Sequence, residues 1–388
     1  MSGIFRDPEK LSPTYIPEKL YGREGELETL SGFFEDFLSK PGDTYPVPVQ
    51  VLGPVGSGKT SLSRSYSMRL ERECSKLGIK LKTIYVNCKA RALSRRDLYS
   101  FFLREIGSTL KGLSTSLLLE KFLELLYEGN NFALIILDEV DYLVMREKIG
   151  KEEGSVIYDL TRLNEIAPRE AKMVVGVIFI SRDRRWHSML DESEISTLGY
   201  RFVRLSRYGS ETLERIMCDR IEDAFRCDVD DGAVELIAHV AANKRVNPGD
   251  ARFALDALYL AGKIAEREGG RKVSLKHARM ALGDMIDGIT SEDLMGMNRE
   301  EILVLLGAAR ACSYVPFAPR TDVYEEYRAL CEERGVKPIT SGKFNHYLTD
   351  LRMRGLINES ERGIYMVWAP FMDLEDRLER VLRRFGIE

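Results

Sequence analysis

Residues 53–60 read Gly53-Pro54-Val55-Gly56-Ser57-Gly58-Lys59-Thr60, and they lie between an apolar run at 47–52 and a stretch of helical periodicity that reaches about residue 77. Glycines allow the backbone to pass close to a phosphate group with its N–H groups pointing inward. A helix that begins there adds the positive end of its dipole. The stretch therefore predicts a phosphate-binding loop at the point where a strand leads into a helix.

The last residues of this loop indicate its ligand. In loops of this pattern the lysine, here Lys59, reaches the β- and γ-phosphates, and the hydroxyl of the next residue, Thr60, binds Mg²⁺. We therefore predict ATP or ADP with Mg²⁺ as the ligand. The residues of the loop expected to contact the nucleotide are Gly53, Pro54, Val55, Gly56, Ser57, Gly58, Lys59, Thr60 and Ser61.

A second stretch supports a nucleotide site. Residues 134–137 are apolar and lead directly into Asp138 and Glu139. We expect Asp138 to hold Mg²⁺ through water, and Glu139 to orient and deprotonate the attacking water, so both are candidate catalytic residues. The alternative is a buried strand followed by a solvated acidic turn, which the phosphate-binding loop upstream disfavours.

The spacing of the apolar stretches predicts an α/β fold. Helical patterns at 26–40 and 95–128 lie among short runs typical of strands, and strands that alternate with helices indicate a parallel sheet with helices on both faces. The expected strands are 47–52, 82–87, 132–137 and 173–180. After about residue 205 the pattern is helical only, so the sheet is expected to end there.

Three domains follow from this pattern. We predict a nucleotide-binding base with an N-terminal arm at 1–205, a helical lid at 206–290 and a third domain at 291–388. A linker is expected within 283–296, which is rich in Gly, Asp and Met. In the third domain, helices precede a predicted hairpin at 356–368, and a closing helix follows it.

The composition of the chain excludes several classes of protein. The chain has 388 residues and a net charge of −4, so any contact with nucleic acid must come from a local basic patch. No apolar run approaches the roughly 20 residues of a membrane span, and the N-terminus has no apolar signal core. The six cysteines form no C-x-x-C pair, which argues against a zinc site and a disulfide framework. We therefore expect a cytoplasmic protein.

Three further motifs carry a family resemblance. Residues 21–24 read Tyr-Gly-Arg-Glu, residues 138–143 read Asp-Glu-Val-Asp-Tyr-Leu, and residues 247–256 read Asn-Pro-Gly-Asp-Ala-Arg-Phe-Ala-Leu-Asp. With these motifs the chain resembles, nearly end to end, the archaeal origin recognition complex/cell division control (ORC/CDC-type) replication initiators, which are AAA+ ATPases. The resemblance implies an AAA+ P-loop base, an all-α lid and a C-terminal winged-helix domain.

The resemblance also implies roles for residues outside the loop. The arm that contains Tyr15, Ile16 and Arg23 would pack on adenine and ribose. Arg252 would be a second sensor that reaches the γ-phosphate from the lid and acts in catalysis. A guanidinium suits this task because it stays charged and donates in a planar fork. The alternative for Arg252 is an ordinary arginine on a helix surface.

Two positions depart from the family's pattern. Arg182 stands where the family has an asparagine that helps to place the attacking water. Ser193 stands where the family usually has an arginine that acts on a neighbouring subunit. Because an arginine finger raises the rate of hydrolysis by about 10³–10⁵, we expect weak ATPase activity and a long-lived bound nucleotide, often ADP.

Residues 341–354 predict a recognition helix that begins after a capping threonine, Thr340. Phe344, Leu348 and Leu351 share an apolar face with Tyr347 at helical spacing. The opposite face is polar and partly basic, which suits a DNA major groove. The candidate DNA contacts on it are Ser341, Lys343, Asn345, His346 and Arg352. The alternative is a solvated helix in a protein-interaction domain.

Two more elements are candidate DNA contacts. Gly363 permits the turn of the predicted hairpin, and Arg362 at its tip is expected to meet phosphate or the minor groove. The resemblance also implies an initiator-specific DNA-binding element at about 106–116. There Lys111 and Gly112 would meet phosphate, and the alternative is an ordinary loop between helices.

The function implied by the resemblance is that of a DNA replication initiator associated with the nucleoid. Such a protein binds double-stranded origin DNA, can act beside a sister initiator paralogue, and marks the origin for loading of the MCM replicative helicase. Two alternatives remain open. They are a nucleotide-regulated winged-helix transcription factor and an AAA+ DNA-remodelling motor, and the missing arginine at Ser193 argues against the motor.

Overall fold

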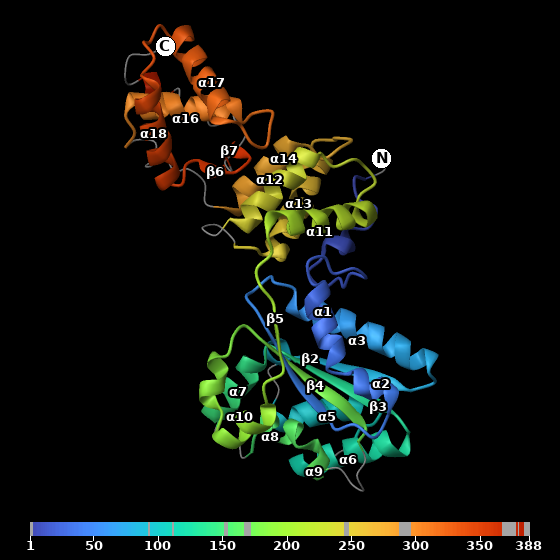
Figure 1. Cartoon of the computed structure of the whole chain (residues 1–388). Coiled ribbons are helices and arrows are strands. Elements are labelled where there is room, and N and C mark those ends of the chain that lie inside the picture. Colours follow the sequence, from blue (N-terminus) through green and yellow to red (C-terminus); the bar gives the residue numbers. More distant parts are fainter. Residues whose placement is uncertain are drawn as a thin grey trace. The chain divides into compact units, whose positions relative to one another are not determined.

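The computed structural model describes residues 3–91, 94–110, 112–150, 154–166, 172–243, 248–286, 296–366, 378 and 380–383. The chain forms two compact units (Figure 1). One unit is 16–207, and the other combines the first 15 residues with those from 208 onward. None of the helices in the described ranges has the length and hydropathy needed to span a bilayer.

The first unit is built on a five-stranded sheet in the order β2-β3-β4-β1-β5, and every neighbouring pair is parallel. Its strands are β1 (Val47–Leu52), β2 (Leu81–Asn87), β3 (Phe132–Asp138), β4 (Val174–Ser181) and β5 (Phe202–Arg204). The predicted parallel sheet is confirmed. Strand β5 was not predicted, because it has only three residues and arginines on either side of its two apolar ones.

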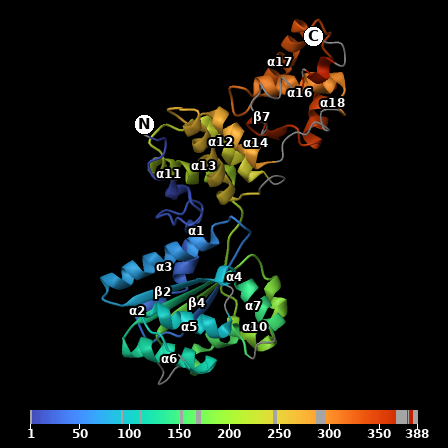
Figure 2. The same cartoon turned by 180° about the vertical axis from the view of Figure 1, so that it is seen from behind.

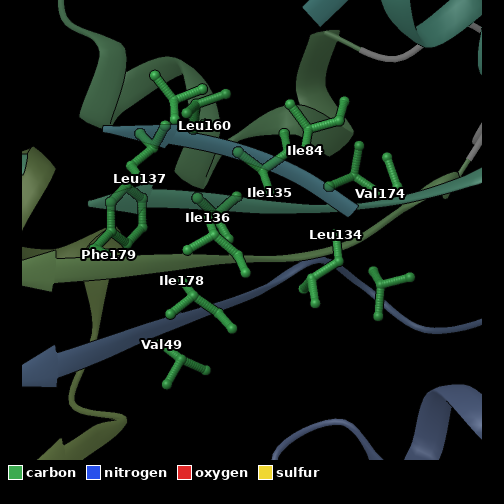
Figure 3. Packing of buried hydrophobic residues seen from close by; sticks show 14 of the residues in the cluster. Val49, Ile84, Leu134, Ile135, Ile136, Leu137, Leu160, Val174, Ile178 and Phe179 are labelled. Carbon is green, nitrogen blue, oxygen red and sulfur yellow. The ribbon is translucent and has the colours of Figure 1, made fainter. Parts of the chain in front are cut away.

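The core of this unit lies around the central strands. Every residue of β3 and of β4 is buried, as expected for strands covered on both faces. Figure 3 shows Ile136 of β3 beside its register partner Ile178 of β4. Helices lie on both faces of the sheet, with α3 on one and α5 and α6 on the other (Figure 1 and Figure 2).

The first helix of this unit differs from expectation, and no ranges were predicted for the helices between β3 and β5. The helix expected over 26–40 is broken at Phe33 and Phe34 into α1 and α2, and the buried Phe34 ring stacks on Tyr66. The helices are α1 (Glu24–Gly32), α2 (Glu35–Ser39), α3 (Lys59–Lys76), α4 (Cys88–Arg91), α5 (Arg95–Glu105), α6 (Thr115–Glu128), α7 (Val140–Gly150), α8 (Val156–Thr161), α9 (Leu163–Ile166), η3 (Arg185–Met189) and α10 (Glu192–Leu198).

The second unit begins with a helical lid that incorporates the N-terminal arm. Phe5 packs on Phe225 with ring centroids 4.8 Å apart, and the Arg6 amide donates to the Ala224 carbonyl. The first 15 residues thus group with the lid, whereas the sequence had placed the arm with the base. The elements of the lid region are η1 (Pro8–Leu11), α11 (Ser210–Ala224), α12 (Asp231–Ala242), α13 (Ala251–Arg267) and α14 (Leu275–Met285).

The remainder of the second unit is a winged helix, as predicted. Its elements are α16 (Arg299–Ala311), α17 (Arg320–Glu333), α18 (Ser341–Met353), β6 (Asn358–Ser360) and β7 (Gly363–Tyr365). Strands β6 and β7 form an antiparallel hairpin, and Ala318 adds a bridge to Ile364. Its own apolar core includes Leu306, Tyr327 and Phe344. Most of the predicted linker and of the closing helix lies outside the described residues.

Candidate functional site

The phosphate-binding loop joins β1 to α3 in the conformation that its glycines allow. Gly56 and Gly58 have φ angles of 72° and 87°, in the left-handed region that disfavours other residues. A Cβ on Gly53 would lie 2.8 Å from the Leu205 carbonyl oxygen, so this position has no room for a side chain. The backbone therefore takes the tight path that a phosphate cradle requires.

Lys59 begins α3 and lies within the loop. Its ammonium donates to the carbonyl oxygens of Gly53 and Pro54, each at 2.7 Å. A cation is thus placed over the loop at the N-terminal end of an 18-residue helix, where the helix dipole also favours an anion. This is the arrangement that an anionic phosphate chain needs.

The structure brings Thr60 and Asp138 together, although 78 positions separate them in the chain. The Thr60 hydroxyl donates to Asp138 Oδ2 at 2.6 Å. The carboxyl ends of neighbouring parallel strands meet at one edge of a sheet, and α3 starts beside the end of β3 for this reason. A hydroxyl and a carboxylate at this distance fit Mg²⁺, which takes oxygen ligands and usually keeps several waters. No group of three or more His, Cys, Asp or Glu side chains that could hold a metal ion occurs among the described residues.

Tyr85 is a site residue that the sequence reasoning missed. Its hydroxyl donates to Asp138 Oδ2 at 2.9 Å. Burial, followed by the charge of Asp138, raises the pKa of Tyr85 well above its usual value, so the phenol stays a proton donor. The Arg64 guanidinium lies 5.0 Å from the centroid of its ring. The sequence pattern does not indicate this contact, because it depends on the register of β2 and β3, in which Asn87 pairs with Asp138.

Glu139 has an unusual backbone. Its φ angle is 54°, in the left-handed region, and its amide donates to Asp138 Oδ1 at 2.9 Å. A non-glycine residue in this conformation costs about 1–3 kcal/mol and persists where its surroundings enforce it. The half-buried Glu139 stands between β3 and α7, beside the Thr60–Asp138 pair. This position suits the predicted role of orienting a water.

Arg23 lies within the sheet unit, and its guanidinium contacts protein atoms. The side chain is 3% exposed and donates to the carbonyls of Ser57 and Ser206 and to Glu26. Ser57 belongs to the phosphate-binding loop, so the hydrogen bond from Arg23 to the Ser57 carbonyl helps to hold that loop in place. The expectation that Arg23 packs on adenine or ribose remains a prediction.

The other expected nucleotide contacts are divided between the two units. Ile16 is the first residue of the sheet unit, whereas Tyr15 belongs to the lid unit, where Lys10 and Arg220 lie over its ring at 4.4 Å and 4.7 Å. Arg252 is exposed in the first turn of α13, and the Asp250 side chain caps that turn. Its role as a second sensor remains a prediction.

The two positions that depart from the family's pattern have defined surroundings. Arg182 follows the last residue of β4 and is exposed. Ser193 lies in the first turn of α10, where its hydroxyl donates to Asp191, the capping residue. Ser193 therefore helps to start a helix and presents no cation.

The recognition helix α18 has the two faces expected. Phe344, Leu348 and Leu351 are buried, and the predicted DNA contacts Ser341, Lys343, Asn345, His346 and Arg352 are exposed. Thr340 stands at the N-cap position but accepts no side-chain hydrogen bond, so its predicted capping role is wrong. His346 lies 3.4 Å from Asp350 on the same face.

Three arginines at or near the hairpin are engaged within the protein, namely Arg320 of α17, Arg352 of α18 and Arg362 between β6 and β7. Arg352 and Arg320 both contact the Glu359 carboxylate, at 3.0 Å and 2.5 Å, and the hydrogen bond from Arg320 is the main cause that lowers the pKa of Glu359. Arg362 lies 3.4 Å from Glu214 of the lid. Gly363 is required by packing, because a Cβ there would lie 2.7 Å from the Ala318 carbonyl oxygen.

Lid and winged helix share further contacts within the second unit. The Asn243 amide donates to the Tyr365 hydroxyl at 2.9 Å. Arg279 of α14 is 8% exposed and donates to the carbonyls of Ser313 and Val315, and it also bonds Cys312. A buried guanidinium with several backbone acceptors fixes the segment between α16 and α17 on the lid.

The predicted second DNA element is described only in part. Lys111 lies outside the described residues. Gly112 is exposed and has a φ angle of 81°, and the next carbonyl, that of Leu113, accepts from Arg96. The stretch connects α5 to α6, so a loop between helices and a DNA contact remain alternatives.

Family models match three consecutive parts of the chain. An AAA domain matches residues 48–187, a Cdc6 AAA+ ATPase-type lid domain matches 214–282, and a CDC6 C-terminal winged helix domain matches 293–368. The order of these matches is the predicted order of base, lid and winged helix.

Known proteins are similar over most of the chain. The ORC1-type DNA replication protein of Pyrococcus horikoshii is 32% identical over 362 residues, which are 92% of this chain and 83% of that protein. The Cdc6p structure from Pyrobaculum aerophilum has the same fold, with a TM-score of 0.82, 24% identity and coverage of 98% and 99% of the two chains. The Aeropyrum pernix ORC1 protein, solved in complex with DNA, has a TM-score of 0.63 and is 28% identical, with 98% of each chain covered.

Proposed function

We propose a function from one premise: this chain belongs to the ORC1/Cdc6 family of DNA replication proteins. In our proposal it is a replication initiator that binds ATP or ADP with Mg²⁺ and recognises double-stranded origin DNA. It thereby marks the origin for loading of the MCM helicase, alone or with a sister paralogue.

The observation that carries the DNA part is the exposed polar face of α18 in a winged helix. Lys343 and Asn345 extend from this face, and Phe344 anchors it from behind with 2% of its side chain exposed. An asparagine can form two hydrogen bonds with N6 and N7 of adenine in the major groove, and a lysine can bond guanine or phosphate. The Aeropyrum pernix ORC1 protein, which is 28% identical, was solved in complex with DNA.

The nucleotide part rests on the Thr60–Asp138 pair at the end of the phosphate-binding loop. Bound Mg²⁺ would neutralise charge on the phosphates. The residues of this chain would have three further roles: Lys59 would bind phosphate, Glu139 would hold the attacking water, and Arg23 would keep the loop in position. We further propose that Arg252 contacts the γ-phosphate and thereby couples the bound nucleotide to the position of the lid.

The contacts between lid and winged helix support a role of the nucleotide as a conformational clamp. Asn243, Arg279 and Arg362 each join the two within one unit. A change in the lid would therefore move the winged helix with it. The bound nucleotide would set how α18 meets DNA, without repeated hydrolysis.

The rate of hydrolysis tests this clamp. With an arginine at 182 and no cation at 193, we expect bound ATP to persist for minutes or longer in a single-turnover assay with Mg²⁺. The physical reason is that no guanidinium at position 193 stabilises the negative charge of the transition state on a neighbouring subunit. Such a group raises the rate of hydrolysis by about 10³–10⁵. Hydrolysis within seconds by the isolated chain would contradict the clamp and favour a motor.

Footprinting on genomic fragments tests the function as a whole. We expect protection of a short repeated element beside a replication origin, at protein concentrations that leave unrelated duplexes unprotected. The specific site should bind about 10³-fold or more tightly than random DNA. Protection confined to promoters away from any origin would instead support the alternative function, that of a nucleotide-regulated transcription factor.

A further inference from the structure

Beyond the nucleotide loop, two short segments of the sheet unit carry a concentration of arginines. Segment 182–187 follows β4, and segment 200–207 contains β5. Together they hold Arg182, Arg184, Arg185, Arg201, Arg204 and Arg207, with Asp183 as their one acid. The chain as a whole has a net charge of −4, so this concentration is local.

The fold brings the two segments together around one aromatic ring. The Arg184 guanidinium lies 4.7 Å from the centroid of the Phe202 ring, and that of Arg204 lies 5.4 Å from it. Stacking on a ring orients a guanidinium and keeps its donors directed outward. Two cations that share one ring also repel each other, so a counter-charge would stabilise this arrangement.

Within the described ranges, no carboxylate supplies that counter-charge. Asp183 is held by Arg185, with 2.8 Å between Nε and Oδ2, and this bond lowers the pKa of Asp183. For Arg182, Arg184, Arg201 and Arg204, which we call the arginine surface, no carboxylate of another described residue lies within ion-pair distance. All four are exposed.

We propose that the arginine surface binds the phosphate backbone of duplex DNA, as a contact on the sheet unit that is separate from α18 and from the predicted element at 106–116. Interfaces with DNA are polar and strongly positive, whereas the centre of a protein interface is apolar. Among the large apolar side chains of the two segments only Tyr200 is strongly exposed, at 77%, and Trp186 is buried. The chemistry therefore favours a phosphate chain over an acidic protein.

The inference rests on the proposed DNA-binding function, and its test separates the two. We would measure duplex affinity against salt from about 50 to 200 mM for the full chain and for the double variant Arg184→Gln/Arg204→Gln. Loss of two phosphate contacts should lower the magnitude of the log–log slope by about 2, equally for specific and random duplexes. Glutamine removes the charge and keeps a polar side chain that reaches Cδ.

Two further variants control the result. Arg69→Gln/Arg72→Gln removes the same charge from exposed positions of α3 and should leave the slope unchanged. Arg184→Lys/Arg204→Lys keeps the charge and should retain the slope, which distinguishes a phosphate contact from a packing role of the two arginines.

An unchanged slope in the glutamine variant would overturn the inference. If α18 variants still weaken binding in that case, the proposed function survives. A slope that falls equally in the α3 control would also overturn it, because net charge alone would then be the cause. A wild-type chain that binds no duplex would remove the proposed function itself.

Discussion

Replacement of Lys59 by alanine should abolish nucleotide binding at ordinary concentrations. The ammonium lies over the loop, 2.7 Å from the carbonyl oxygens of Gly53 and Pro54, where it can turn to the phosphates. Removal of a partner from a desolvated charge pair costs about 2–5 kcal/mol, which corresponds to a loss of about 30-fold or more in affinity. Isothermal titration with ADP and with a non-hydrolysable ATP analogue would measure the loss.

The matched control is Lys76→Ala. Lys76 lies in the last turn of the same helix, is exposed, and carries the same charge far from the loop. Its replacement should leave both affinities unchanged. Equal affinities for the Lys59→Ala variant and the wild type would refute the assignment of the loop.

Joint replacement of Lys343 and Asn345 by alanine should abolish selective DNA binding. Both side chains are exposed on α18, whereas the buried Phe344 and Leu348 keep the helix in place, so the fold should persist. A contact to a base edge is worth about 1–3 kcal/mol. Two such contacts give an expected loss of about 30-fold or more at the specific site, with a much smaller loss on random duplex.

Fluorescence anisotropy with the footprinted element and with a scrambled duplex would measure this difference. Lys272→Ala, at an exposed position of the lid, is the charge-matched control and should behave as wild type. A loss of the same size on both duplexes would show that α18 contacts backbone only. No loss on either would place recognition elsewhere.

The local motifs of the site could be predicted because each is short and has its own physical signature. The loop at 53–60 needs glycines at fixed spacing, and the structure shows two of them at positive φ. The strand before Asp138 is a continuous apolar run because it is buried on both faces. Since parallel strands present their carboxyl ends at one edge, the approach of Thr60 to Asp138 also followed from the pattern.

Prediction was weaker where an element is short or where a long side chain has several possible partners. Strand β5 has three residues, too few for a periodic signal. The N-terminal arm joins the lid through contacts between residues far apart in the chain, such as that of Phe5 with Phe225, which lie 220 positions apart. The sequence predicts Tyr85 only as part of the strand at 82–87, and its contact with Asp138 depends on the register of β2 and β3.

The arginines show most clearly which features the sequence determines and which the tertiary structure determines. The sequence by itself determined the phosphate-binding loop, the acidic end of β3 and the two faces of α18, because all three are set by neighbours a few positions away. Only the tertiary structure decided that Arg23 helps to hold the loop in place, that Arg362 pairs with the lid, and that Arg184 meets Arg204 over one ring. A guanidinium on a long flexible stem can reach many acceptors, and its choice among them depends on which distant segments the fold brings within a few ångströms.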